Sequence, residues 1–141
     1  MSSFKAFDIA GSGMSAQSVR LNTTASNLAN AESVSGDANS VYKPRHPIFE
    51  AVRQQLGAAQ AENGNAAVRV RGIYESQAPA AARYEPGNPL ADANGYVYAP
   101  AVNVVEEMVN MISASRSYQN NVEVMNTSKD LLLATLRLGQ S

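Results

Sequence analysis

Apolar residues recur at intervals of seven at both ends of this chain, and this repeat constrains the fold more than any other feature. The first repeat consists of Phe7, Met14, Leu21 and Leu28, and the second of Val104, Met111, Tyr118, Met125 and Leu132. Such a repeat is typical of a helix whose seam packs against another helix. Two such helices at opposite ends of a 141-residue chain predict a subunit of an assembly rather than a catalyst.

The first helix is expected over residues 3–31 and a longer second helix over 101–138. Asn103 followed by Glu106 resembles a capping box at the start of the second helix, and Gly139 is a natural terminator. The predicted seam of the second helix alternates steps of four and three residues: Val104, Met108, Met111, Ser115, Tyr118, Val122, Met125, Lys129, Leu132 and Leu136. We predict that the two helices pair as a coiled-coil hairpin.

The middle of the chain, residues 32–100, is expected to hold loops and a small β region. Residues 32–47 are rich in turn formers, and Pro44 and Pro47 exclude a helix there. Val68–Arg71 alternates apolar and charged residues, as a half-buried strand does. Residues 73–74 extend this strand past Gly72.

Two further segments of the middle region are strand candidates. Residues 83–85 are expected to pair back onto the strand at 68–74, and Tyr96–Tyr98 is the other candidate. Residues 56–67 have the composition of a flexible surface loop. The fold class is therefore mainly α with a small β region, divided into residues 1–31, 32–100 and 101–141, with both helices in one domain.

Charge and composition exclude several functions. The chain has 11 basic and 12 acidic residues, so its net charge of -1 gives no reason to expect nucleic acid or an anionic membrane surface as a partner. It has no cysteine, which excludes disulfides and thiolate metal sites, and no apolar run long enough to cross a bilayer. The N-terminus does not resemble a cleavable secretory signal.

No group of residues resembles a catalytic or metal site. His46 is the only histidine and lies between prolines, so we interpret it as an exposed loop residue. Asp92, Asn94 and Gly95 look like part of a calcium loop, but no glutamate follows at the needed spacing and a turn is expected instead. We predict no cofactor, no metal and no enzymatic activity.

The faces of the two helices carry very little charge. Between residues 9 and 31 the only charged side chain is Arg20, and between 108 and 122 it is Arg116. A solvated helix face is normally charged, whereas small neutral side chains permit close approach of other backbones. The sequence therefore predicts helices that are surrounded by protein on several sides.

Three segments resemble flagellar rod and hook proteins, the axial proteins of the bacterial flagellum. Residues 25–31 (ASNLANA) resemble the motif that ends the first helix of that family, and residues 84–97 resemble the middle region of a proximal-rod subunit. Residues 107–139 resemble the C-terminal signature of the family. The matching motif residues include Asn27, Asn30, Glu107, Arg116, Tyr118, Gln119 and Asn121.

The resemblance implies a structural subunit of a helical tube that encloses an export channel and transmits torque across the periplasm. It implies as partners further copies of the chain, the proximal rod proteins B and F, the distal rod protein G, an adaptor of the inner-membrane ring and the flagellar type III export apparatus. Location in the basal body, export without a cleaved signal and a middle region that fixes subunit orientation are implied in the same way.

Two other interpretations remain open from the sequence. The chain could be a different axial subunit, although distal rod and hook subunits carry a larger middle region. It could also be a soluble coiled-coil adaptor or chaperone with no role in a filament.

Overall fold

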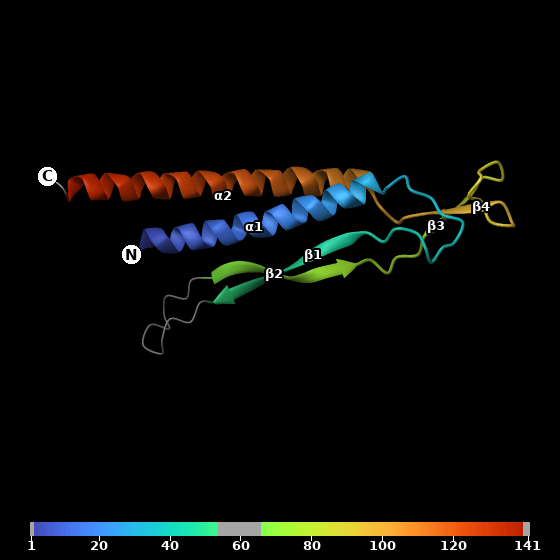
Figure 1. The fold of residues 1–141 in the computed structure, drawn as a ribbon, viewed down its shortest axis with the longest axis horizontal. Coiled ribbons are helices and arrows are strands. Elements are labelled where there is room, and N and C mark those ends of the chain that lie inside the picture. Colours follow the sequence, from blue (N-terminus) through green and yellow to red (C-terminus); the bar gives the residue numbers. More distant parts are fainter. Residues whose placement is uncertain (1, 54–65, 140–141) are drawn as a thin grey trace. The chain divides into compact units, whose positions relative to one another are not determined.

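The computed structural model describes residues 2–53 and 66–139. Two long helices enclose four strands along the chain, as the colours of Figure 1 show: α1 (Ser2–Ala29), β1 (Arg45–Arg53), β2 (Ala66–Glu75), β3 (Ala81–Tyr84), β4 (Tyr96–Ala99) and α2 (Val104–Leu138). The prediction of a mainly α fold with a small β region is confirmed.

Helix α2 begins at Val104, three residues after the predicted start, and ends at Leu138 as predicted. The backbone N–H groups of Val105 and Glu106 donate to the Asn103 side-chain oxygen at 3.1 and 3.3 Å, so Asn103 is the N-cap. Two glutamates in the first turn and Arg137 in the last turn complement the helix dipole. At the other end, the Gly139 N–H donates to the carbonyl of Thr135 at 3.2 Å.

Strands β1 and β2 form a two-stranded sheet. The sequence predicted the strand that corresponds to β2 but not β1. Ion pairs of 3.0 Å join Arg45 to Glu75 and Arg69 to Glu50, which sets the strands antiparallel. Residues 32–47 were expected to be irregular, but β1 begins at Arg45 and includes Pro47. A proline is tolerated there because the strand lies at the edge of a two-stranded sheet.

Strands β3 and β4 form a separate antiparallel sheet, with Ala81 opposite Ala99 and Tyr84 opposite Tyr96. The prediction that residues 83–85 pair with the strand at 68–74 is therefore wrong. The rings of Tyr84 and Tyr96 lie 5.3 Å apart, edge to face, a cross-strand pair that stabilises the observed pairing.

A tight turn before β4 also favours this pairing. The carboxylate of Asp92 accepts the N–H groups of Asn94 and Tyr96, both at 2.9 Å. Gly95 has a φ of 82°, a conformation that glycine adopts without strain. Residues 92–95 thus form the predicted turn.

The described chain divides into two compact units, each with its own small core. The first comprises Met1–Val19, Ile48–Gly72 and Ser113–Ser141, and the second comprises Arg20–Pro47 and Ile73–Ile112. Buried residues of the first unit are Ala10, Ala16, Ala114 and Ser128. Those of the second are Thr23, Thr24, Asn27, Val41, Pro44, Val97, Ala99, Pro100 and Glu107. Both cores are built from small or polar side chains.

The predicted flexible loop falls mostly outside the residues that the structure describes. Residues 56–65 of this loop lie outside the described residues, whereas Ala66 and Ala67 lie in β2. The predicted strand at Val68 therefore begins two residues earlier, and it continues past Gly72 as expected.

Candidate assembly surfaces

In the first unit, α1 and α2 pack closely and run antiparallel. A β-carbon placed on Gly13 would lie 2.8 Å from the side-chain nitrogen of Asn121, and one on Gly11 would lie 3.8 Å from the terminal methyl of Met125. The order of these contacts is reversed along the two helices, which sets their direction. The absence of a side chain at Gly13 lets the helices approach within contact of Asn121.

Most residues of the heptad repeats have partly buried side chains in the structure. Partly buried are Phe7, Met14, Leu21 and Leu28 on α1, and Met111, Tyr118, Met125 and Leu132 on α2. Val104, at the first turn of α2, is 39% exposed. The role of these residues in pairing and assembly stays a prediction.

Of the five interleaved positions of the predicted α2 seam, Ser115 and Val122 are partly buried and the other three are exposed. Met108 and Leu136 are exposed by more than half, and Lys129 is exposed. The buried residues Glu107, Ala114 and Ser128 each lie one position before an interleaved seam position. The buried row of α2 therefore carries small and polar side chains, which leaves several large apolar ones on its outer face.

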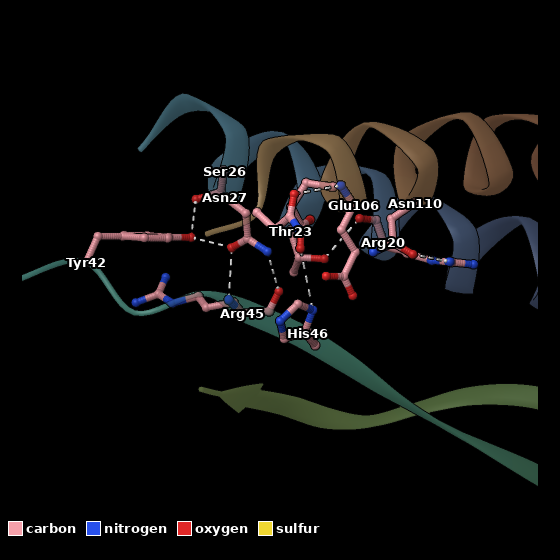
Figure 2. Close-up of polar contacts among 11 residues, drawn as sticks. Arg20, Thr23, Ser26, Asn27, Tyr42, Arg45, His46, Glu106 and Asn110 are labelled. Atoms are coloured by element: carbon pink, nitrogen blue, oxygen red, sulfur yellow. Dashed lines mark hydrogen bonds and ion pairs between the residues drawn. The ribbon is translucent and has the colours of Figure 1, made fainter. Parts of the chain in front are cut away.

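In the second unit, the side chain of Asn27 joins α1 to the start of β1 (Figure 2). Its amide nitrogen donates to the carbonyl of Arg45 at 2.9 Å, and its oxygen accepts the N–H of Arg45 at 2.9 Å and the hydroxyl of Tyr42 at 2.8 Å. Asn27 is fully buried. Because one amide side chain pairs with both backbone groups of Arg45, it acts like a neighbouring strand and fixes where β1 begins.

Two further polar contacts accompany Asn27 in the second unit. The Tyr42 hydroxyl lies 3.1 Å from that of Ser26, and the guanidinium of Arg20 donates to the Asn110 side-chain oxygen at 2.8 Å. Figure 2 shows Arg20 and Asn110 meeting between the two helices. Sequence reasoning noted Arg20 as an isolated charge and missed Tyr42 and Asn110, because no local pattern marks a residue whose partner is about 15 or 90 positions away.

Glu107, three positions before Asn110 on α2, has a buried carboxylate. It is 4% exposed, and one of its oxygens lies 3.9 Å from the Nδ1 atom of His46. The other oxygen has no hydrogen-bond partner among the described residues. His46 was expected in a loop, but it lies in β1 and its half-exposed side chain faces Glu107. Burial of a carboxylate with one weak contact is costly.

The residues of the C-terminal motif separate into two groups. Glu107 is buried, and Tyr118 and Asn121 are partly buried. Arg116 and Gln119 are exposed. On α1, Asn27 is buried, whereas partly buried Asn30 donates to the carbonyl of Ser26 at 2.8 Å, near the end of the helix. Among these motif residues, Asn27 and Asn30 make hydrogen bonds within the subunit, and Arg116 and Gln119 are exposed.

Helix α2 exposes large apolar side chains on more than one side. Its large apolar side chains that are at least half exposed are Val105, Met108, Val109, Ile112, Leu131, Leu136 and Leu138. Large apolar side chains that are exposed in clusters mark sites of protein association.

The described residues show no cluster of metal-ligating side chains. None of their helices is sufficiently long and apolar to span a bilayer. A helix pair with small polar cores and large exposed apolar residues is the arrangement of an assembly subunit.

Comparison with known proteins identifies the assembly. Residues 7–36 match a family described as flagella basal body rod protein, and residues 93–138 match the C-terminal region of flagellar basal body rod FlgEFG proteins. The matched ranges cover most of α1 and all of α2. The chain is thus of the class of flagellar rod proteins.

Close relatives define the family further. The flagellar basal-body rod proteins FlgC of Salmonella typhimurium and of Escherichia coli O6:H1 are 56% and 57% identical to this chain, over 95% of this chain and 96% of each relative. That of Yersinia enterocolitica is 54% identical over 99% of this chain and its own full length. The chain belongs to the FlgC family of flagellar basal-body rod proteins. It is a structural subunit of the basal body, not an enzyme, and it assembles with rod proteins.

Proposed function

We propose that this rod subunit assembles in the proximal rod as part of a helical tube, which encloses the export channel and transmits torque from the inner-membrane ring to the hook. The observation that carries the proposal is the exposed apolar face of α2. A monomer in water gains nothing from exposing Val105, Val109 and Leu131, whereas a tube buries such side chains between neighbours.

The paired helices are proposed to form the wall of the tube. Residues 1–31 and 101–141 make up this inner-tube domain, and residues 32–100 form a collar that fixes the orientation of the subunit. The contacts of Gly13 with Asn121 and of Arg20 with Asn110 support the pairing. The hydrogen bonds of Asn27 to Arg45 support a fixed attachment of the collar to α1. Torsional stiffness then follows from close packing shared among many subunits.

We propose that the neighbours include copies of the chain, the proximal rod proteins B and F, the distal rod protein G and the adaptor of the inner-membrane ring. The export apparatus is a further, transient partner. Support comes from the motif residues Arg116 and Gln119, because their side chains are exposed on the described part of the subunit and are accessible to a neighbour.

The test is a deletion strain complemented with the chain. We expect restored motility and recovery of the chain in purified basal bodies, together with the other rod proteins. An adaptor would restore motility while staying absent from the basal bodies. Light scattering adds a second criterion, because an adaptor stops at a small oligomer and an axial subunit polymerises or waits for its partners. Absence of the chain from basal bodies of motile cells would refute the proposal.

A further inference from the structure

The first part of α2 presents four apolar side chains on one face. Val105, Met108, Val109 and Ile112 follow the spacing i, i+3, i+4, i+7, and each is between 54% and 69% exposed. Residues at this spacing are the anchors with which a helix packs against a partner helix or groove. These four residues are called the leading stripe below.

A second exposed row lies in the last part of α2. Val124, Leu131 and Leu138 recur every seven residues and are 49%, 60% and 77% exposed. A seven-residue apolar repeat is the pattern of a helix–helix seam, and this one runs beside the buried row that contains Ser128 rather than along it. These three residues are called the trailing stripe.

The two stripes are separate surfaces on different sides of one helix. Seven residues after Ile112 comes Gln119, and seven residues before Val124 comes Ser117, so each row ends in polar residues. Ile112 and Leu131 are 19 positions apart, which rotates one against the other by about 100°. One partner helix therefore cannot run along both stripes.

We infer that the leading stripe of one copy packs against the trailing stripe of a second copy, with the two α2 helices parallel and offset by 19 residues. This inference rests on the proposed function and names the surface through which copies of the chain associate. The offset places Val105 beside Val124 and Ile112 beside Leu131, because both rows have the same seven-residue spacing. The axial displacement is about 28 Å.

Charge supports a second copy as the occupant. With the 19-residue offset, Arg116 of one copy lies level with residue 135 of the second copy. It is therefore five positions from the second copy's Asp130, the residue before Leu131. Five positions is the spacing of the interhelical ion pairs that flank the seam of a parallel coiled coil. Both side chains are exposed in the subunit. At the interleaved positions of this contact, Met108 of one copy lies beside Thr127 of the second, and Ser115 lies beside Ala134, so each pair includes at least one small side chain.

This contact explains how the chain polymerises. Each copy uses one patch toward one neighbour and a different patch toward the next, which is a heterologous contact. Such contacts generate open helical assemblies, whereas a contact of one patch with itself closes as a dimer.

Cysteine cross-linking tests the contact directly, because the chain has no cysteine. Basal bodies are purified from deletion cells that express the Ile112→Cys, Leu131→Cys double variant and are then oxidised. We expect a ladder of bands at multiples of the 14.9 kDa chain mass. Each single variant gives no ladder, since one cysteine links at most two copies. The control pair is Ile112→Cys with Lys129→Cys, because Lys129 is exposed on another face of α2.

A charge exchange provides a second test without cysteines at the apolar positions. Arg116→Glu or Asp130→Arg alone is expected to lower incorporation into basal bodies at least threefold, and the double exchange restores it to within twofold of the parent. The matched control combines Arg116→Glu with Glu123→Arg, which does not restore incorporation because Glu123 faces Val109 in this register.

Four results would overturn the inference: basal bodies that contain the variant but give no ladder, an equal ladder from the control pair, a cross-linked product that contains another protein, or a failed exchange. Failure of the proposed function has a different signature, since the parent chain itself would then be missing from the basal bodies of motile cells.

Discussion

At the scale of single residues, Asn27 has the most consequential side chain. It satisfies the N–H and the carbonyl of Arg45 and also accepts the hydroxyl of Tyr42, all from a fully buried position. Asparagine is a weak helix former because its side chain competes for backbone groups. In this protein the Asn27 side chain binds the backbone of Arg45 instead of the backbone of its own helix. This contact explains why an asparagine stands within α1.

We predict that Asn27→Ala releases residues 42–46 from α1. The backbone groups of Arg45 lose their partners, and an unmade buried hydrogen bond costs about 1–3 kcal/mol. Trypsin should therefore cut after Arg45 about ten times faster or more, because cleavage follows the population of the open form. Mass spectrometry of the digest measures the rate. Asn22→Ala, at an exposed position of the same helix, serves as the control. Equal rates in both variants would show that Asn27 does not hold this segment.

At the scale of elements, the two helices of the first unit lie as close as their glycines allow. Gly11 and Gly13 are separated by one residue but have different surroundings. A β-carbon at Gly11 meets only the flexible end of Met125 at 3.8 Å, whereas one at Gly13 meets the short side chain of Asn121 at 2.8 Å. Each glycine also lowers helix propensity by about 1 kcal/mol relative to alanine.

We predict different effects of alanine at these two positions. Gly11→Ala should stabilise the chain by about 0.5–1 kcal/mol, because the helix gains propensity and the new methyl has room. Gly13→Ala should stabilise it less or destabilise it by about 1 kcal/mol, since Asn121 must move. Thermal unfolding of the associated chain, followed by circular dichroism at a concentration at which helicity is fully formed, gives both values. If both variants gain equally, α1 and α2 do not approach as closely at Gly13 as the structure has it.

The seam residues support a second prediction at this scale. Leu28→Asp and Leu132→Asp each place a charge at a partly buried position that is predicted to pack between the helices, and we expect loss of rod assembly and of motility. Leu28→Met and Leu132→Met keep the volume and should remain motile. Motility in soft agar and recovery of basal bodies measure the effect. Motile cells carrying either aspartate variant would exclude that leucine from the seam.

At the scale of the whole molecule, the chain has little to stabilise it alone. The fully or nearly fully buried residues are small or polar, with Val97 and Asn27 the largest among the described side chains exposed by less than 2%. The larger apolar residues of α2 stay in contact with water. A long helix whose apolar side chains are exposed obtains its stability from packing against other molecules.

We predict that residues 1–31 and much of 101–141 are only marginally helical in the free monomer and fold fully on assembly. Circular dichroism of the dilute chain should then show fewer helical residues than the 28 of α1 and the 35 of α2, with a broad thermal transition. Helicity should rise as association begins at higher concentration. Full helicity with a cooperative transition at high dilution would contradict this view.

The sequence by itself determined the two helices, the cap of α2 and its C-terminal end, whereas the other helix ends differ by one to three residues from the predicted ones. Heptad spacing, the cap at Asn103 and the terminating Gly139 are local signals, and local signals suffice because every backbone hydrogen bond of a helix joins residues that are near in sequence. The turn at Asp92–Gly95 was predictable for the same reason. Family membership was also within reach, because the terminal motifs are contiguous.

Only the tertiary structure decided which segments meet. The partner of β3, the strand formed around His46 and the attachment of Arg45 to Asn27 all join residues whose pairing no local pattern specifies. The buried row of α2 also follows from tertiary packing, since Glu107 and Ala114 are inside while Met108 and Ile112 are outside. Hydrophobicity alone assigned the larger residues to the interior. In a subunit of a polymer, part of the apolar surface is kept for neighbouring chains, so burial within one chain does not follow side-chain size.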